Sequence, residues 1–157
     1  MALSRCAVHP AALSDKPIIK AQLTHYLREL SQFGDVGEEY PYLDRYWQAG
    51  EQRWPYLIRS GPELAGFALV NAHSVTPQPV DFAMAEFFVQ PKQRGAGIGL
   101  AAMEALFARH PGTWEIAVMV GNHQARRFWQ RVLERLSVRD LQSSEVDGMI
   151  VHRFAAP

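Results

Sequence analysis

Residues 86–100 of the chain are EFFVQPKQRGAGIGL, and this stretch decides the fold class. Its apolar start continues a run from Val80, so residues 80–89 are predicted to form a strand buried on both faces. A turn with Pro91 follows, and residues 95–110 are predicted to be helical. A buried strand that runs through a glycine-rich loop into a helix indicates an α/β protein.

The loop itself has the composition of an anion site. The first N–H groups of a helix have no partner within the helix, and the helix dipole adds partial positive charge there. Gly95, Gly97 and Gly99 carry no side chain that would keep a phosphate away. Lys92 and Arg94 add positive charge beside them. The sequence therefore predicts a cradle of the kind that holds a pyrophosphate.

Three alternatives concern the ligand of this loop. No Lys-Ser or Lys-Thr follows the glycines, as a P-loop requires, which disfavours nucleoside triphosphate hydrolysis. Leu100 stands where a dinucleotide-binding GxGxxG motif has its last glycine, so that match is poor. A glycine turn without a ligand stays open. However, each glycine in helical backbone costs about 1 kcal/mol relative to alanine, which favours a ligand.

The rest of the chain predicts one mixed α/β domain over residues 1–157. The remaining expected elements are a helix that begins after Asp15 and runs through Leu30, a loop at 31–41, a short helix at 42–48, a hairpin of strands at 54–59 and 64–71, a strand at 114–120, a helix at 125–136, and two weak strands around Asp147-Gly148.

Composition excludes several classes of protein. With 48% hydrophobic and 20% charged residues, the chain is neither disordered nor fibrous. It has no run of 18 apolar residues and no apolar signal segment, so we expect neither a membrane span nor secretion. Cys6 is the only cysteine, which excludes an internal disulfide and favours the cytoplasm. The six histidines lack HxxxH or HxH spacing, so we expect no metal site.

The net charge of zero argues against a nucleic-acid partner. The charges are nevertheless segregated, because residues 31–90 carry a net −5 and residues 91–139 a net +5. This pattern fits two ligands of opposite charge, or two ordinary solvated surfaces.

Two motifs resemble the GCN5-related N-acetyltransferase (GNAT) superfamily. Val89-Gln-Pro91 followed by Arg94-Gly-Ala-Gly97-Ile-Gly99 is similar to that family's acyl-CoA loop, Arg/Gln-x-x-Gly-x-Gly/Ala. Downstream, Asn122-His-Gln-Ala125-Arg-Arg-Phe128-Trp129 is similar to its second motif. The resemblance covers residues 80–136 and includes the spacing of one helix and one strand between the motifs.

The resemblance implies a central twisted, mixed, mostly antiparallel sheet flanked by about four helices. Its fourth and fifth strands, residues 80–89 and 114–120, would splay apart and hold acetyl-CoA between them. The implied cofactor-binding residues are Phe87, Phe88 and Val89 for the pantetheine arm, Arg94, Gly95, Ala96, Gly97, Ile98 and Gly99 for the pyrophosphate, Asn122 for the pantetheine end, and Trp129 near the sulfur.

Glu86 is the expected catalytic group. A carboxylate in an apolar strand can have a raised pKa and accept the proton of an attacking amine. A carboxylate at the rim of the sheet, or in an ion pair, is the alternative. Trp129 stands where the family often has a tyrosine acid, and an indole does not release a proton near neutral pH. Ordinary core packing is the alternative for Trp129.

An aromatic and acidic cluster is the expected acceptor site. It comprises Tyr40, Tyr42, Tyr46 and Trp47 with Glu38, Glu39 and Asp44. Such groups suit a cationic amine, although a packed aromatic helix beside a solvated acidic loop would look the same in sequence.

The sequence thus predicts an acetyl-CoA-dependent N-acetyltransferase acting directly on a primary amine of a small molecule or peptide. A non-catalytic acyl-CoA sensor and a nucleotide-binding protein are the alternatives. The acceptor and the acyl chain length are left open, as is the homodimer that is frequent in the family.

Overall fold

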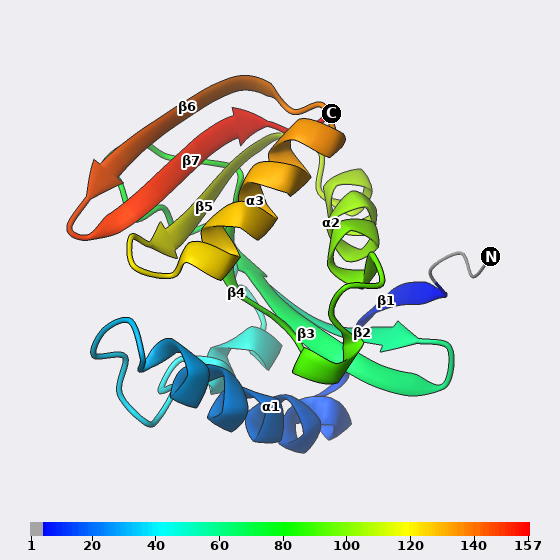
Figure 1. Ribbon diagram of the computed structural model, residues 1–157. Coiled ribbons are helices and arrows are strands. Elements are labelled where there is room, and N and C mark those ends of the chain that lie inside the picture. The colour runs from blue at the N-terminus through cyan, green and yellow to red at the C-terminus, as the bar shows by residue number, and fades with distance from the viewer. Residues whose placement is uncertain (1–4) are drawn as a thin grey trace.

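The computed structural model describes residues 5–157 and contains a seven-stranded sheet in the order β1-β2-β3-β4-β5-β7-β6 (Figure 1). The strands are β1 (Cys6–Pro10), β2 (Arg53–Ser60), β3 (Glu63–Asn71), β4 (Phe82–Val89), β5 (Thr113–Met119), β6 (Arg139–Val146) and β7 (Met149–Ala155). The helices are α1 (Lys16–Leu30), α2 (Ile98–Arg109) and α3 (His123–Arg135), with short 3-10 helices η1 (Leu13–Asp15), η2 (Leu43–Trp47) and η3 (Pro91–Gln93). Among the strands of residues 5–157, β4 and β5 alone pair in parallel, so the expected mixed, mostly antiparallel sheet is confirmed.

Helices cover both faces of the sheet. Figure 1 shows α1 on one face and α2 with α3 on the other. Phe107 of α2 and Trp114 of β5 lie in the core between the sheet and α2 and α3. Ile19 of α1 and Phe67 of β3 lie in a second core on the α1 face. Because β3 is buried on both sides, its sequence is almost continuously apolar.

Three differences from the expected elements have physical reasons. β1 was not expected, because its five residues carry no clear pattern and depend on pairing with β2. The helix expected at 42–48 is the 3-10 helix η2, so residues 5–157 contain three α-helices rather than about four. α2 begins at Ile98 rather than at Gly95, because Gly95 and Gly97 adopt left-handed φ angles of 86° and 80°.

A bulge in β4 determines where its side chains point. Leu69 of β3 lies opposite Glu86 and Val70 lies opposite Met84, which leaves Ala85 as the extra residue. Met84 therefore packs in the core beneath α2 and α3, whereas Glu86 turns toward α1 and contacts Tyr26 there.

β4 and β5 form a wedge. They pair at Phe82–Trp114, Ala83–Glu115 and Met84–Ile116 only, although β4 continues to Val89 and β5 to Met119. The closed end is fastened by Asp81, whose Oδ2 accepts the Thr113 N–H at 2.9 Å and whose own N–H donates to Thr113 Oγ1 at 3.0 Å. The expected splay of the fourth and fifth strands is confirmed.

The close approach of β3 and β4 predicts a specific sensitivity. A Cβ atom at Gly66 would lie 1.9 Å from the Phe88 carbonyl oxygen. Gly66→Ala should therefore lower the free energy of unfolding by about 2 kcal/mol or more, measured by urea denaturation. Gly121→Ala is the control, because a Cβ there meets no atom within 4 Å. Equal stability of the two variants would contradict the β3–β4 packing described.

Candidate active site

A cavity of about 1020 Å³ occupies the wedge between β4 and β5. Its lining comes from both strands, from the loop before α2, from α3 and from α1. Glu86 lines this cavity, and so do all the cofactor-binding residues expected from sequence except Ala96. The structure therefore brings the two sequence motifs and Glu86 to one place.

The loop before α2 presents main-chain donors to the cavity. Gly97 is the N-cap of α2, and the first helical hydrogen bond runs from Ala101 N–H to Gly97 O at 3.0 Å. The amides of residues 98–100 consequently have no acceptor within the helix. A Cβ at Gly95 or Gly97 would meet nothing within 4 Å, so open space adjoins these two residues.

Gly99 has a different structural reason from the other two glycines. A Cβ there would lie 2.6 Å from Cε1 of Phe128, so the missing side chain lets α2 approach α3. Gly95 and Gly97 satisfy left-handed backbone angles. The glycine content alone therefore does not require a ligand, and the anion site is supported instead by the amides that open onto the cavity.

Arg94 is engaged within the protein. Its main-chain N–H donates to Pro91 O at 3.2 Å. In its side chain, Nε donates to Val89 O at 2.8 Å and Nη2 pairs with Glu29 Oε1 at 2.8 Å. It thereby fastens the loop to the end of β4 and to α1. The amides offered to an anion accordingly lie beyond Arg94.

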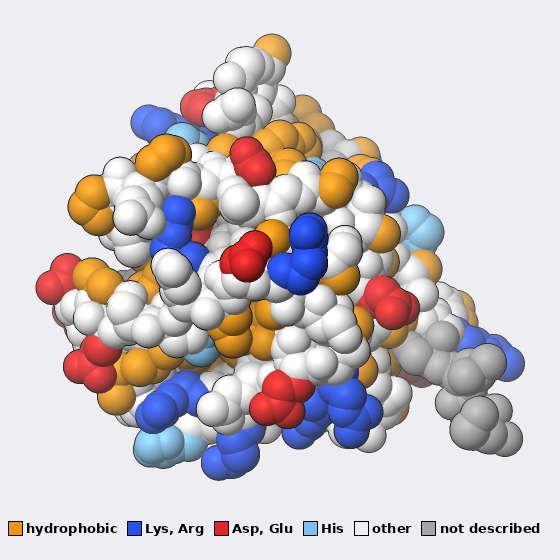
Figure 2. Space-filling view, turned by 90° about the horizontal axis from the view of Figure 1, so that it is seen from above, with side chains coloured by type: hydrophobic (Ala, Val, Ile, Leu, Met, Phe, Trp, Pro, Cys, Tyr) orange, Lys and Arg blue, Asp and Glu red, His pale blue; other side chains and the backbone are white. Residues whose placement is uncertain are grey.

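α3 brings polar and basic groups to the same cavity. The Oδ1 of Asn122 accepts the Ala125 N–H at 3.2 Å and caps the helix, so a ligand would take the Nδ2 group. Arg127, Arg131 and Arg135 recur every four residues and all line the cavity. In Figure 2, Lys and Arg side chains gather along the lower edge of the face seen from above.

Trp129 belongs to the core and to the cavity wall at once. It is 6% exposed, and its ring centroid lies 5.3 Å from that of Phe87 and 4.9 Å from that of Phe128. The structure therefore agrees with the packing alternative while placing the indole at the wedge.

Glu86 lies on the opposite side of the wedge from Trp129. The Tyr26 hydroxyl donates to its Oε1 at 2.9 Å. Burial raises the pKa of Glu86 to about 7, while the phenols of Tyr26 and Tyr40 act in the lowering direction. Within residues 5–157 no Lys, Arg or His forms an ion pair with Glu86, so the ion-pair alternative is not what the structure shows.

The aromatic cluster expected at the acceptor site is mostly structural. Tyr40 lines the cavity, but Tyr46 is buried and accepts a hydrogen bond from Asn71 at 3.2 Å. Trp47 donates to Ala11 O at 3.0 Å, and Asp44 pairs with Lys16. Tyr42, Glu38 and Glu39 do not line the cavity. On the side of α1 the cavity is lined instead by Tyr26, Tyr40, Asn71 and His73.

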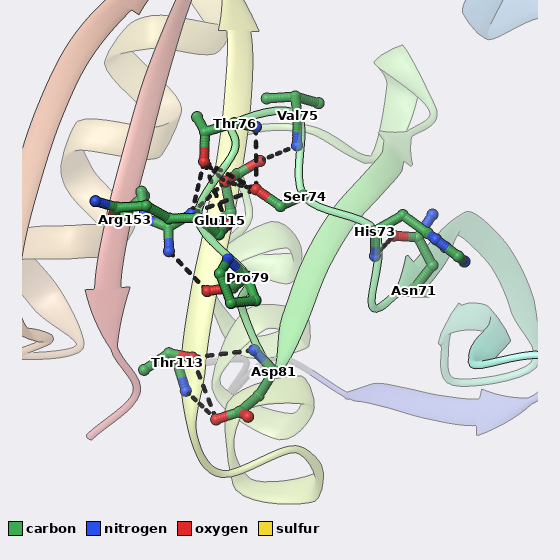
Figure 3. A network of polar contacts seen from close by, with 11 residues as sticks. Asn71, His73, Ser74, Val75, Thr76, Pro79, Asp81, Thr113, Glu115 and Arg153 are labelled. Atoms are coloured by element: carbon green, nitrogen blue, oxygen red, sulfur yellow. Dashed lines mark hydrogen bonds and ion pairs between the residues drawn. The ribbon is translucent and has the colours of Figure 1, made fainter.

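The buried carboxylate of Glu115 and the partly exposed Arg153 form a polar network that sequence reasoning missed (Figure 3). Glu115 of β5 is 2% exposed and accepts from Val75 N–H, Ser74 Oγ and Arg153 Nη1, each at 2.7 Å. Arg153 of β7 also donates to Pro79 O at 2.9 Å. The network holds the β3–β4 loop beside the cavity. The sequence carried no signal for it, because the two residues meet only when β5 and β7 pair.

The Acetyltransferase (GNAT) family model matches residues 21–134, which include the wedge and both motifs. The chain belongs to the GNAT acetyltransferase family. Mycothiol acetyltransferase of Nocardia farcinica is 37% identical in an alignment 117 residues long, which covers 64% of this GNAT chain and 36% of that protein. The chain thus spans about a third of that relative's length.

Solved structures share the GNAT fold. The GNAT domain of S. lividans PAT superposes with a TM-score of 0.68 at 16% identity, covering 96% of this chain and 90% of that one. An acetyltransferase from Thermus thermophilus gives a TM-score of 0.65 at 19% identity, covering 99% of both chains.

In residues 5–157, no helix is long and apolar enough to cross a membrane. Across the same range, His, Cys, Asp and Glu side chains form no group of three suited to a metal ion.

The Glu115–Arg153 network predicts a large effect of removing one charge. Arg153→Met leaves Glu115 buried without its cation, so the free energy of unfolding should fall by about 3 kcal/mol in urea denaturation. Lys16→Met is the control, because the Asp44 carboxylate that it leaves is largely exposed, and should cost below about 1 kcal/mol. Equal losses would show that the Glu115–Arg153 pair does not hold the loop.

Proposed function

We propose that the chain is an N-acyltransferase that takes its acyl group from acetyl-CoA and transfers it directly to a primary amine. The observation that carries the proposal is the continuous cavity in the wedge. It joins the unpaired amides at the start of α2 to the half-buried carboxyl group of Glu86.

The open edge of β4 suits the pantetheine arm. Gln90 N–H donates to Ala65 O at 2.7 Å, and strand alternation turns the main chain of Phe88 toward β3 as well. The main-chain groups of Phe87 and Val89 then face the wedge. Because Arg94 occupies Val89 O, the N–H and C=O of Phe87 and the N–H of Val89 are the groups that would pair with the amides of the arm.

The phosphate end of acetyl-CoA would lie at the start of α2. The amides beyond Arg94, which begin at Gly95, offer donors at the positive end of the helix dipole. Arg127, Arg131 and Arg135 line the same cavity and supply charge for a polyanion. The Asn122 Nδ2 group would bind the pantetheine end. The acetyl group then reaches the wedge near Phe87.

In the proposed reaction, the acceptor reacts as the neutral amine, and Glu86 accepts the proton that its nitrogen loses on attack, directly or through water. The amine nitrogen attacks the thioester carbonyl, the C–S bond breaks, and the CoA thiolate leaves with the electron pair. Main-chain N–H groups of β4 that face the wedge would stabilise the oxyanion. The proton taken by Glu86 reaches the thiolate through water, because the indole of Trp129 cannot supply it.

The residues on the acceptor side favour a cationic amine as the substrate. This side combines the Glu86 carboxyl group with the aromatic faces of Tyr26 and Tyr40. A screen for the acceptor would measure acetylation of small amines, of a peptide N-terminus and of a lysine peptide. The acceptor implied by the name of the Nocardia relative belongs in it too.

The donor site predicts selective binding of acetyl-CoA. Calorimetry should show micromolar binding of acetyl-CoA and none of ATP or NAD. Gly97→Glu should weaken it about 100-fold, or about 2.7 kcal/mol, since a carboxylate would occupy the phosphate space. Gly50→Glu is a matched control, because Gly50 has a similar φ of 81°, open space around its Cβ position and no place in the cavity. Equal binding by both variants would contradict the site.

Glu86 predicts a pH dependence. A base must be ionised, so kcat/KM should rise with pH through about 7 as the carboxyl group loses its proton. Glu86→Gln should lower kcat by about 10²- to 10⁴-fold and abolish this dependence, with little change in acetyl-CoA affinity. Glu38→Gln, outside the cavity, is the control.

Unchanged pH dependence in Glu86→Gln would contradict its role as base. A wild-type chain that binds acetyl-CoA and consumes none with any amine would favour the second candidate, a non-catalytic sensor. The observation behind that candidate is Trp129 in place of an acid.

A further inference from the structure

Helix α1 contributes a phenol to the wedge. The ring of Tyr26 packs edge-on against Phe67 of β3 and Phe88 of β4, each at a centroid distance of 5.8 Å. These two contacts fix the direction of the ring. Its hydroxyl group reaches Oε1 of Glu86 at 2.9 Å, and both side chains line the cavity.

We propose that Tyr26 is the positioning residue of Glu86: its hydroxyl group holds the carboxylate in the orientation and ionised form that accept the acceptor's proton. The inference deepens the proposed function and rests on it, because it assumes that Glu86 is the base. It adds α1, which carries neither sequence motif, to the groups that act on the reaction.

The need for such a partner follows from the bulge. The extra residue Ala85 turns Glu86 out of the α2 side and places it against α1, where burial favours the neutral acid. A neutral acid cannot accept a proton. A hydrogen bond donated to the ionised carboxylate stabilises that form, and the Tyr26 hydroxyl is placed to donate it.

A second phenol acts on Glu86 in the same way but more weakly. Tyr40, from the segment before η2, acts on its pKa in the same direction as Tyr26 and with a smaller effect. The other carboxylates that line the cavity are paired, Glu29 with Arg94 and Glu115 with Arg153.

The remaining ionisable side chains of the cavity lie on other elements. His73 lines it from the loop after β3, and Arg127, Arg131 and Arg135 line it from α3. In the range 5–157, no cationic side chain lies within 4 Å of the Glu86 carboxylate, so phenols are the groups available to keep it ionised.

The first test needs no acceptor. The Glu86 carboxyl group can be titrated by infrared difference spectroscopy, with Glu86→Gln to assign its band. The wild type should titrate near pH 7, and Tyr26→Phe should raise the midpoint by about one unit, because the ionised form loses a donor. Tyr26→Phe keeps the ring and its packing. Tyr42→Phe is the control and should leave the midpoint unchanged, because Tyr42 is 51% exposed and lies outside the cavity. An unshifted midpoint in Tyr26→Phe would overturn the inference.

The second test uses an amine that the wild type acetylates. Tyr26→Phe should shift the rise of kcat/KM to higher pH and lower it about fivefold at pH 7, with acetyl-CoA affinity retained. In a Glu86→Gln background the same change should have no further effect. Equal losses in both backgrounds would show that Tyr26 does not act through Glu86. The absence of turnover would contradict the proposed function, while the titration decides the role of Tyr26 independently.

Discussion

The parallel pairing of β4 and β5 stops after three residue pairs, and the active-site geometry depends on that stop. Two neighbouring strands that paired along their full length would leave no space between them. Here the Asp81–Thr113 hydrogen bonds fasten one end, and the strands diverge beyond Met84 and Ile116. The cavity, the open edge of β4 and the approach of α3 to that edge all follow from this wedge.

The bulge at Ala85 determines which side chains of β4 face α1 and which face α2 and α3. Without the extra residue, strand alternation would place Glu86 on the same face as Met84, beneath α2 and α3. With it, Glu86 and Phe88 face α1, while Phe87 stacks on Phe128 of α3. One inserted residue thus separates the carboxyl group on one side of the wedge from the aromatic wall on the other.

Local patterns in the sequence were sufficient to predict the half of the cavity that adjoins α2 and α3, which is the proposed donor site. The apolar run into Val89, the glycine loop and the residues from Asn122 to Trp129 act over short distances along the chain, and the structure gathers them around one cavity. The reason for Gly99 could not be predicted, because it depends on Phe128 of another helix.

The half of the cavity that adjoins α1, which is the proposed acceptor site, is built from contacts that join distant segments. Tyr26 lies on the apolar stripe of α1, so its position in the sequence indicates a core residue. Its contact with Glu86 forms only when β4 packs beside α1. Glu115 and Arg153 meet only across the β5–β7 pairing. The segment 40–47 is rich in aromatic residues, as expected for an acceptor site. However, Tyr46 and Trp47 make hydrogen bonds that hold η2 in place, and only Tyr40 lines the cavity.

Amide hydrogen exchange with and without acetyl-CoA tests the wedge most directly as the donor site. Exchange should slow on binding at residues 87–89, at residues 95–100 and at the start of α3, while exchange in β1 and β6 at the two edges of the sheet stays unchanged. Protection confined to other segments, or no protection at saturating acetyl-CoA, would contradict that role of the wedge.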